Sequence, residues 1–456
     1  MTTGGGELAA QARLAAPLAA QQVGMVAMGV VDTALLGRFD ADAMAGAGIG
    51  TALLFALSCL GIGALLGLDP LIAQAIGAGE RARTPRLLAV GVRVAVQLGL
   101  ALTLVVLAAP VALRLGGVDP AVAGHAAVYI YARALGVVPM LVQVALRAFL
   151  QAHGHTRPML VAAIVGNVAN AVLDWILIFG DDGLADLGLP RVGLPPLGAL
   201  GAALATTAVT FVLLLIYARA IAEVRRGLPP PLADEPPAAI RRAILRLGGP
   251  IGLQLFAEVA AFALAAVLAG RLGAVPAAAH QIALQLSSVS FAIALGIGGA
   301  AATRVGLAIG AGDHRRARHA ALTSLGLGAI VMSSSAALFV LAPGPLAALF
   351  GARVEVAASA ATLVQIAAVF QLSDGAQAIA AGALRGAGDT RAAFVANLIG
   401  HYAIGLPVAL LAAFTFDQGA PGLWWGLTAG LTGTAIALLA RLAWLTRRPV
   451  ARATIG

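Results

Sequence analysis

Apolar residues in this chain run in long blocks with short polar interruptions. Twelve blocks of about 20 or more residues, each long enough to cross ~30 Å of hydrocarbon as a helix, occupy residues 14–37, 44–68, 88–113, 122–149, 158–180, 197–221, 247–271, 277–303, 319–342, 355–382, 392–415 and 422–445. A membrane β-barrel would show segments of about ten residues with alternating polarity. The pattern instead predicts an all-α polytopic membrane protein with twelve transmembrane helices.

The composition excludes a water-soluble fold. Hydrophobic residues make up 60% of the 456, charged residues only 11%, and the mean hydropathy is +0.95. The single cysteine, Cys59, excludes a disulfide framework. The net charge of +9 comes from arginines that lie mostly in short loops, so it describes membrane topology and we expect no nucleic-acid partner.

Successive loops alternate between many arginines and about one. The rich set holds Arg81, Arg83, Arg86, Arg157, Arg225, Arg226, Arg241, Arg242, Arg304, Arg315, Arg316, Arg318, Arg391, Arg447, Arg448 and Arg452. Loops that carry arginine and lysine stay on the cytoplasmic side of a membrane. We therefore expect a multi-pass protein of the bacterial cytoplasmic (inner) membrane, with both termini and the middle loop in the cytoplasm.

The chain contains an internal repeat. Three matches at offsets of 233 to 234 residues carry it: Ile76–Glu80 with Ile309–Asp313, Arg13-Leu14 and Pro17 with Arg246-Leu247 and Pro250, and Gly154–Arg157 with Gly388–Arg391. The matches are spread along each copy, which composition does not explain. They predict two homologous halves of about 230 residues.

The repeat and the spans together predict the domain organisation. Six spans per half is an even number, so both halves enter the membrane in the same orientation. Parallel repeats of this kind form two lobes around a central cavity. We expect a six-helix lobe at residues 1–222, a proline-rich cytoplasmic linker at 223–243 and a second six-helix lobe at 244–456.

Four acidic residues lie well inside predicted spans. A charge at the bilayer centre costs ~2.5–3.5 kcal/mol on insertion scales, so such residues need a reason to be there. They break the repeat, because each aligns with a non-acidic residue of the other half: Asp32 with Ala265, Asp174 with Val408, Glu258 with Met25 and Asp374 with Met140. Asymmetric acids on a symmetric scaffold indicate ion coupling.

The first half offers a complete candidate site. Asn170 lies one turn before Asp174 on the same helix face. Together with Asp32 and a hydroxyl such as that of Thr206, they supply hard oxygen ligands for Na⁺. Two carboxylates in a dry site would instead repel until one holds a proton near neutral pH. The residues alone permit either ion.

Several motifs carry a family resemblance. They are Val31-Asp32-Thr33 through Leu36-Gly37-Arg38, Ala279–Ala283, Leu384–Thr390 and the Asn170-x-x-x-Asp174 spacing. The first three resemble segments of the multidrug and toxic compound extrusion (MATE) transporters. The spacing in the fifth span resembles the DNA-damage-inducible-F-like branch of that family.

The resemblance implies functional roles for these residues. It places a cation-binding and coupling site, with Na⁺ as a possible metal, at Asp32, Asn170, Asp174 and Thr206. Glu258 and Asp374 resemble the acids that other members use in the second lobe. It implies a cation-coupled (H⁺ or Na⁺) antiporter that exports drug-like, often cationic, organic compounds by alternating access. We expect no cofactor beyond the transported ion, no catalytic residue, and a monomer whose partners are small organic substrates and the lipid bilayer.

Two alternatives remain open from the residues. A lipid-linked precursor flippase of the wider superfamily would tend to have a more basic cavity and extra helices. A membrane-embedded aspartyl protease would need a Gly-x-Gly-Asp signature within a span. The two such motifs here, ending at Asp313 and Asp389, lie in predicted cytoplasmic loops, so we expect no enzyme.

Overall fold

The computed structural model describes residues 4–230, 235–448 and 450–453. Its amino-terminal half contains α1 (Gly4–Phe39), α2 (Ala41–Leu65), α3 (Leu68–Gly77), the short turn η1 (Arg81–Arg83), α4 (Thr84–Leu115), α5 (Pro120–Ala134), α6 (Val137–Ala152), α7 (Arg157–Phe179), α8 (Asp181–Asp186) and α9 (Ala199–Arg226). No strand occurs in these ranges, as the spacing of apolar residues predicts.

The carboxy-terminal half is also helical. It contains α10 (Pro237–Arg271), α11 (Ala274–Gly310), α12 (His314–Leu341), α13 (Pro343–Ala348), α14 (Val354–Gly386), α15 (Thr390–Leu398), the π-helical turn η2 (Ile399–Gly405), α16 (Leu406–Leu410), a second π-helical turn η3 (Leu411–Thr415) and α17 (Ala420–Leu445). Both ends of the stretch expected to be a linker are helical, because α9 continues to Arg226 and α10 begins at Pro237.

The number of membrane spans agrees with the prediction. Eleven helical segments are long and apolar enough to cross a membrane, and the pair α5 and α6, bent by 49°, makes a twelfth if it counts as one span. Pro139 explains the bend, because it lacks the amide proton that would close a helical bond to the Leu135 carbonyl. The all-helical, twelve-span architecture is thereby confirmed.

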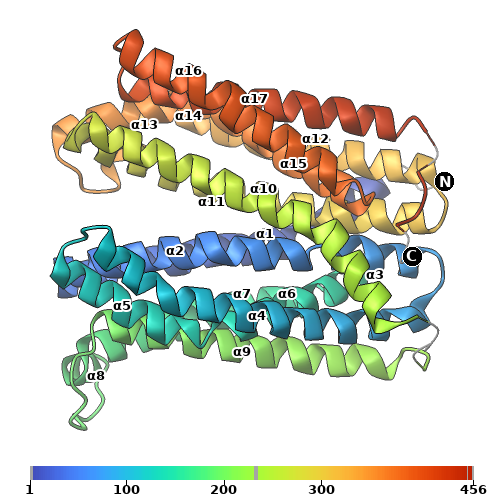
Figure 1. Cartoon of the computed structure of the whole chain (residues 1–456), viewed down its shortest axis with the longest axis horizontal. Coiled ribbons are helices and arrows are strands. Elements are labelled where there is room, and N and C mark those ends of the chain that lie inside the picture. The colour runs from blue at the N-terminus through green and yellow to red at the C-terminus, as the bar shows by residue number, and fades with distance from the viewer. Residues whose placement is uncertain (1–3, 231–234, 449, 454–456) are drawn as a thin grey trace.

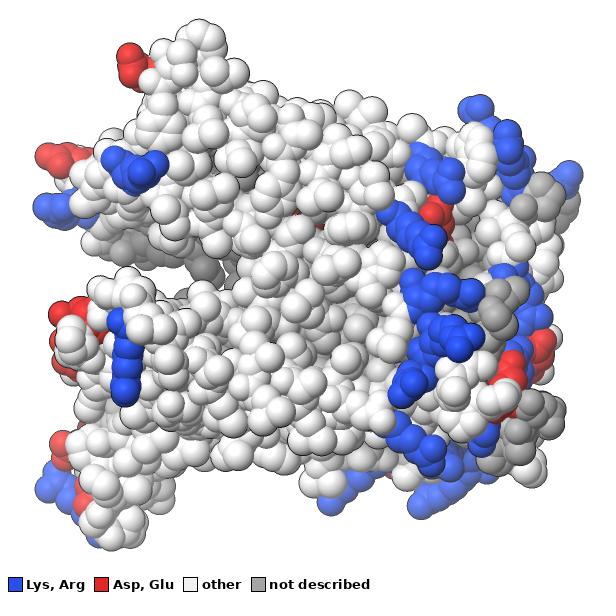
Figure 2. All heavy atoms as spheres, in the orientation of Figure 1, with Lys and Arg blue, Asp and Glu red and all other residues white. Residues whose placement is uncertain are grey.

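The helices form two groups that lie side by side (Figure 1). One group contains the helices up to α9 and the other those from α10 onward. Contacts between the groups are made chiefly by α1 with α11, α2 with α10 and α3 with α11. At one end of the molecule the face in Figure 2 is hollowed between the groups, while arginines gather at the opposite end. We call these the arginine-poor end and the arginine-rich end.

Glycines permit the closest approach between the two groups. A Cβ atom on Gly63 of α2 would lie 2.3 Å from the Cα atom of Gly252 of α10. The repeat-related pair, Gly296 of α11 and Ala19 of α1, approaches just as closely. A Cβ atom on Gly296 would lie 2.4 Å from the Cα atom of Ala19. Such distances are shorter than any tolerated contact, so only glycine fits these positions.

The repeated Ile-Gly-Ala-Gly sequence lies at the same interface. A Cβ atom on Gly77 would lie 2.0 Å from the carbonyl oxygen of Leu307, and one on Gly310 would lie 2.1 Å from that of Gln74. Each copy therefore packs against the other copy. The second glycine of each motif, Gly79 or Gly312, has φ of +81° or +73° and makes the tight turn that the sequence predicts.

Candidate functional site

The four residues predicted for the first site come together from three helices. Asp32 lies on α1, Asn170 and Asp174 on α7, and Thr206 on α9. Asp32 is 9% exposed, while Asn170 and Asp174 are fully buried. The Thr206 hydroxyl lies 3.1 Å from Asp32 Oδ2 and 3.0 Å from the Ala202 carbonyl oxygen, so these two acceptors share its single proton.

The two carboxyl groups of this cluster face each other. Asp32, Asn170 and Asp174 lie close enough to influence one another electrostatically. Asp32 Oδ1, both Asp174 carboxyl oxygens and the Asn170 amide atoms are buried without a hydrogen-bond partner among the described residues. Buried polar atoms are normally paired. This set of unpaired oxygens fits a proton shared by the carboxyl groups or a small cation held between them.

Arg133 contributes a positive charge near this cluster. It lies at the end of α5, before the break to α6, and interacts electrostatically with Asp32. The ion pairs of the described residues include none between Arg133 and either aspartate. Its Nη1 atom is buried without a hydrogen-bond partner. Arg133 therefore lowers the cost of negative charge at Asp32 from a distance and leaves the carboxyl oxygens free to bind a cation.

The acids of the second half form a separate cluster. Glu258 of α10 and Asp374 of α14 are 7% and 4% exposed. The Gln377 side chain donates to Glu258 Oε1 at 3.1 Å and lies 3.4 Å from Asp374 Oδ1. Asn397 of α15 donates to Glu258 Oε2 at 3.1 Å. Amide groups from two helices thus hold both oxygens of the Glu258 carboxylate.

A π-helical turn positions α15 beside Glu258. The turn η2 begins two residues after Asn397 and ends two residues before Pro407, which lacks the amide proton for a regular helical bond to Ala403. Within the turn, Tyr402 donates to the carbonyl oxygen of Ala257 at 2.8 Å. This bond ties η2 to the residue that precedes Glu258. Helical turns of this kind are frequent at functional sites.

Sequence reasoning identified the four acids but missed the two amides around Glu258. Gln377 follows Asp374 by three residues, so the spacing alone places it on the same helix face. Asn397 carries a similar signal as an amide inside an apolar span. Neither signal indicates the partner, because Asn397 and Glu258 lie 139 residues apart in the chain.

Neither cluster is rich enough in strong ligands for a transition metal. The described residues contain no group of three or more His, Cys, Asp or Glu side chains that could hold a metal ion. The first cluster instead combines two carboxylates with an amide and a hydroxyl. Oxygen donors of this kind suit H⁺ or a hard monovalent cation, which would be transported cargo.

A family model describes most of the chain in two parts. The MatE model matches residues 17–176 and again residues 250–411. The two matches begin 233 residues apart, the offset found in the sequence repeat. The residues of both candidate clusters lie within these two ranges, except for Thr206.

Similar proteins match this chain over nearly its whole length. The chain is 37% identical to "Multidrug resistance protein NorM" of Burkholderia vietnamiensis, over 93% of this chain and 91% of that protein. It is 34% identical to "Multidrug resistance protein MdtK" of Edwardsiella ictaluri, over 96% and 95% of the two chains. Because these relatives are named as multidrug resistance proteins and the matching structures as transporters, the membrane-enzyme alternative is set aside.

Solved structures show the same fold. The eukaryotic MATE transporter AtDTX14 superposes with a TM-score of 0.86 at 22% identity, covering 96% of this chain and 95% of that one. The Vibrio cholerae MATE transporter VcmN in its bent form superposes with a TM-score of 0.84 at 20% identity, covering 98% of both. Together with this fold, the family model and the relatives above 30% identity establish that the chain belongs to the MATE family of membrane transporters.

Proposed function

We propose that the protein exports drug-like organic compounds in exchange for an inward-moving cation, H⁺ or Na⁺. Its relatives named NorM and MdtK are multidrug resistance proteins, which supports this class of substrate. Two helical groups around a hollow end are the geometry of alternating access, in which two lobes rock about a central site. The arrangement in Figure 2 is open at the arginine-poor end.

The facing carboxyl groups of Asp32 and Asp174 carry this proposal. Two ionised carboxylates repel each other, so their contact is stable only with a cation or proton between them. Loading that cation from the arginine-poor side would favour one state of the lobes. A ligand shifts a conformational equilibrium only by its different affinity for the two states. The membrane potential adds ~2.3 kcal/mol per charge per 100 mV to inward movement.

The arginine distribution supports an orientation in the bacterial inner membrane. The positive-inside rule supports a cytoplasmic position for the arginine-rich end, both termini and the connection between α9 and α10. The hollow end then faces outward. We propose a monomer with lobes at residues 1–222 and 244–456, because one chain supplies both lobes and the space between them.

The residues of the site bear on two further questions, which are the branch of the MATE family and the flippase alternative. Asn170 and Asp174 favour the DNA-damage-inducible-F-like branch through their spacing. A lipid-linked precursor flippase would need a basic interior, whereas the described clusters hold four acids and one nearby arginine, Arg133. The cation-coupled exporter is therefore the better proposal.

Proteoliposomes loaded with a fluorescent organic cation would test the function. Imposed H⁺ and Na⁺ gradients are applied separately, and substrate-dependent ion flux is followed with pH-sensitive and Na⁺-sensitive dyes. The proposal expects one gradient to drive substrate movement and substrate to elicit flux of that ion. Absence of both effects, or movement of a lipid-linked precursor in their place, would overturn it.

A further inference from the structure

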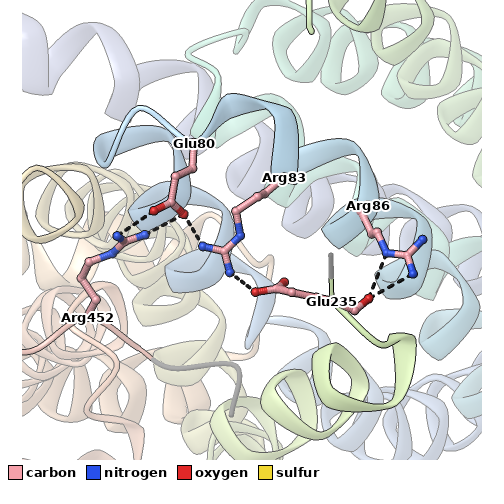
Figure 3. Close-up of polar contacts among 5 residues, drawn as sticks. All are labelled: Glu80, Arg83, Arg86, Glu235 and Arg452. Atoms are coloured by element: carbon pink, nitrogen blue, oxygen red, sulfur yellow. Dashed lines mark hydrogen bonds and ion pairs between the residues drawn. The ribbon is translucent and has the colours of Figure 1, made fainter. Parts of the chain in front are cut away.

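Three segments that are far apart in the sequence meet at the arginine-rich end (Figure 3). They are the turn after α3, the segment before α10, and the carboxy-terminal tail, which we define as residues 446–448 and 450–453. Arg452 of the tail donates to both oxygens of Glu80, at 2.9 and 3.0 Å. A bidentate pair of this kind fixes orientation as well as distance. The tail of the second half is thereby fastened to the first half.

The segment before α10 joins the same network. Arg83 bridges the carboxylates of Glu80 and Glu235, and Arg86 donates to the Glu235 main-chain oxygen through Nε at 3.2 Å and Nη2 at 3.0 Å. Figure 3 shows the five side chains in one row. The network therefore ties the connection between the halves to the turn after α3 as well.

Main-chain contacts of the tail reinforce the attachment. The Ala453 amide donates to Gln74 Oε1 of α3 at 2.7 Å, and Gln74 Nε2 donates to the Gly386 carbonyl oxygen of α14 at 3.0 Å. The Val450 amide lies 3.4 Å from His314 Nδ1 of α12. The tail consequently touches its own half at α12 and the other half at α3.

A deeper layer of bonds joins the halves below the tail. Asp69 of α3 pairs with Arg385 of α14 at 3.2 Å, and Glu7 of α1 pairs with Arg304 of α11. Asp69 lies in the first turn of α3 and bonds across the interface between the halves. The side chains of these two pairs are 7% to 18% exposed, whereas those of Glu80 and Arg452 are 33% and 39% exposed.

We propose that the carboxy-terminal tail is a latch, which holds the arginine-rich end closed through Arg452 and Glu80 and must detach each time that end opens. The inference rests on the proposed alternating access, because only a cycle that opens this end has to break the contact. The tail crosses between halves that rock against each other, so its pairs cannot survive the opposite state. Removing them shifts the resting equilibrium toward opening at the arginine-rich end.

The charge state of the latch makes it sensitive to salt and insensitive to pH. The hydrogen bonds from Arg452, with help from Arg83, lower the pKa of Glu80 to about 2. A carboxylate with a lowered pKa contributes its stabilisation above its ordinary pKa and loses it only as the pH falls toward the lowered value. The surrounding charges are Arg83, Glu235, Arg86 and Arg452. The Glu80–Arg452 pair therefore holds across pH 5 to 8, and salt weakens it because both side chains are partly exposed.

Opening can be measured without any transport. A cysteine at Ala75, which is 3% exposed in α3 where this helix packs on α11, reports access at the arginine-rich end. The protein carries Cys59→Ser and is held in nanodiscs, so both faces meet a membrane-impermeant maleimide. Arg452→Ala should raise the labelling rate of this cysteine about two- to fivefold, the scale of a partly exposed ion pair.

The same tail supplies a matched control. Arg447→Ala removes an exposed arginine for which the described tail residues show no ion pair, and it should leave labelling unchanged. Gly248→Ala sets the upper limit of the labelling rate, because it should separate the two halves. Its Cβ atom would lie 1.8 Å from the Ala64 carbonyl oxygen across the interface. Gly249→Ala, which has open space around its Cβ position, is the control for that variant. Equal labelling rates for Arg452→Ala and Arg447→Ala would overturn the latch.

Cross-linking gives an independent test. A Glu80→Cys, Arg452→Cys pair joined through disulfides by a short bis-methanethiosulfonate reagent should stop substrate transport until a reductant breaks those disulfides. The Asp182→Cys, Arg191→Cys pair replaces a surface ion pair at the arginine-poor end, and joining it should leave transport intact. Full transport with the tail cross-linked would refute the latch. Absence of cation-driven transport in the unmodified protein would refute the proposed function, while the labelling result would stand on its own.

Discussion

The two acid clusters differ in how their carboxylates are satisfied. In the second half, Gln377 and Asn397 donate to Glu258. In the first half, Asp174 has no donor among the described residues, and the Thr206 hydroxyl alone reaches Asp32. A carboxylate that already holds its hydrogen bonds gains little from an added cation. The comparison therefore favours Asp32 and Asp174 as the pair that responds to ion binding.

The clusters also differ in depth. Asp32 lies seven residues from the arginine-poor end of α1, and Glu258 lies thirteen residues from that end of α10. At 1.5 Å per residue these distances are ~10 and ~20 Å. An ion entering from the hollow end reaches the first cluster sooner. The deeper cluster lies where α10 packs against α15 and where Gln377 of α14 reaches Glu258.

The largest expected effect tests the first cluster. Asp32→Asn removes one of the two facing carboxylates, so the site loses a charge to which we assign cation binding in the proposed mechanism. We expect cation-driven substrate efflux to fall to the level of empty vesicles while expression and folding stay intact. Asp182→Asn, at an exposed surface acid, is the control in the same assay. Undiminished efflux by Asp32→Asn would remove the first cluster from the coupling mechanism.

A smaller effect is expected on stability at the second cluster. In Glu258→Gln the new amide nitrogen faces a donor, either Gln377 or Asn397, and one charge-assisted hydrogen bond is lost. Bonds to charged groups contribute ~1.5–3 kcal/mol. We expect a lower melting temperature in detergent, measured by intrinsic fluorescence. An unchanged melting temperature would mean that the two amides do not support the carboxylate.

At the first cluster we expect the opposite change in stability, which is a gain. Asp174→Asn gives Asp32 a hydrogen-bond donor and removes the repulsion between two carboxyl groups, for a gain of ~1 kcal/mol. The melting temperature at pH 8 should rise although transport is lost. Asp174→Ala, which removes the repulsion without adding a donor, separates the two contributions. Destabilisation by Asp174→Asn would show that the carboxyl groups are satisfied in some other way.

The smallest effect is expected at Gln377. Gln377→Met keeps the size of the side chain but removes the amide that lies between Glu258 and Asp374. Since Asn397 still holds Glu258, we expect reduced substrate transport with the direction of coupling unchanged. Initial rates in proteoliposomes with Gln377→Glu as a second variant would check this. A complete loss of coupling would indicate that the second cluster is the principal ion site.

Local patterns were sufficient to predict most of the fold. Apolar blocks predicted the spans because a membrane imposes a minimum length of about 20 apolar residues on every spanning helix. The acids were visible because charge is rare in such blocks. The sequence could not indicate that Asn397 meets Glu258 or that η2 is π-helical, because both depend on packing between distant helices. The extension of α9 and α10 into the expected linker was also missed, since polar residues at a helix end resemble a loop.

The repeat has a consequence for how the chain can change. The contacts of Gly77 with Leu307 and of Gly310 with Gln74 are related by the same two-fold operation that builds a symmetric homodimer. The protein is, in this sense, a dimer whose subunits are fused and have been free to diverge. Positions on the shared surface remain bound to their counterparts, so a larger side chain on one copy collides with the other. Positions away from it carry no such constraint, which is how the two halves could come to differ at Asp32 and Ala265.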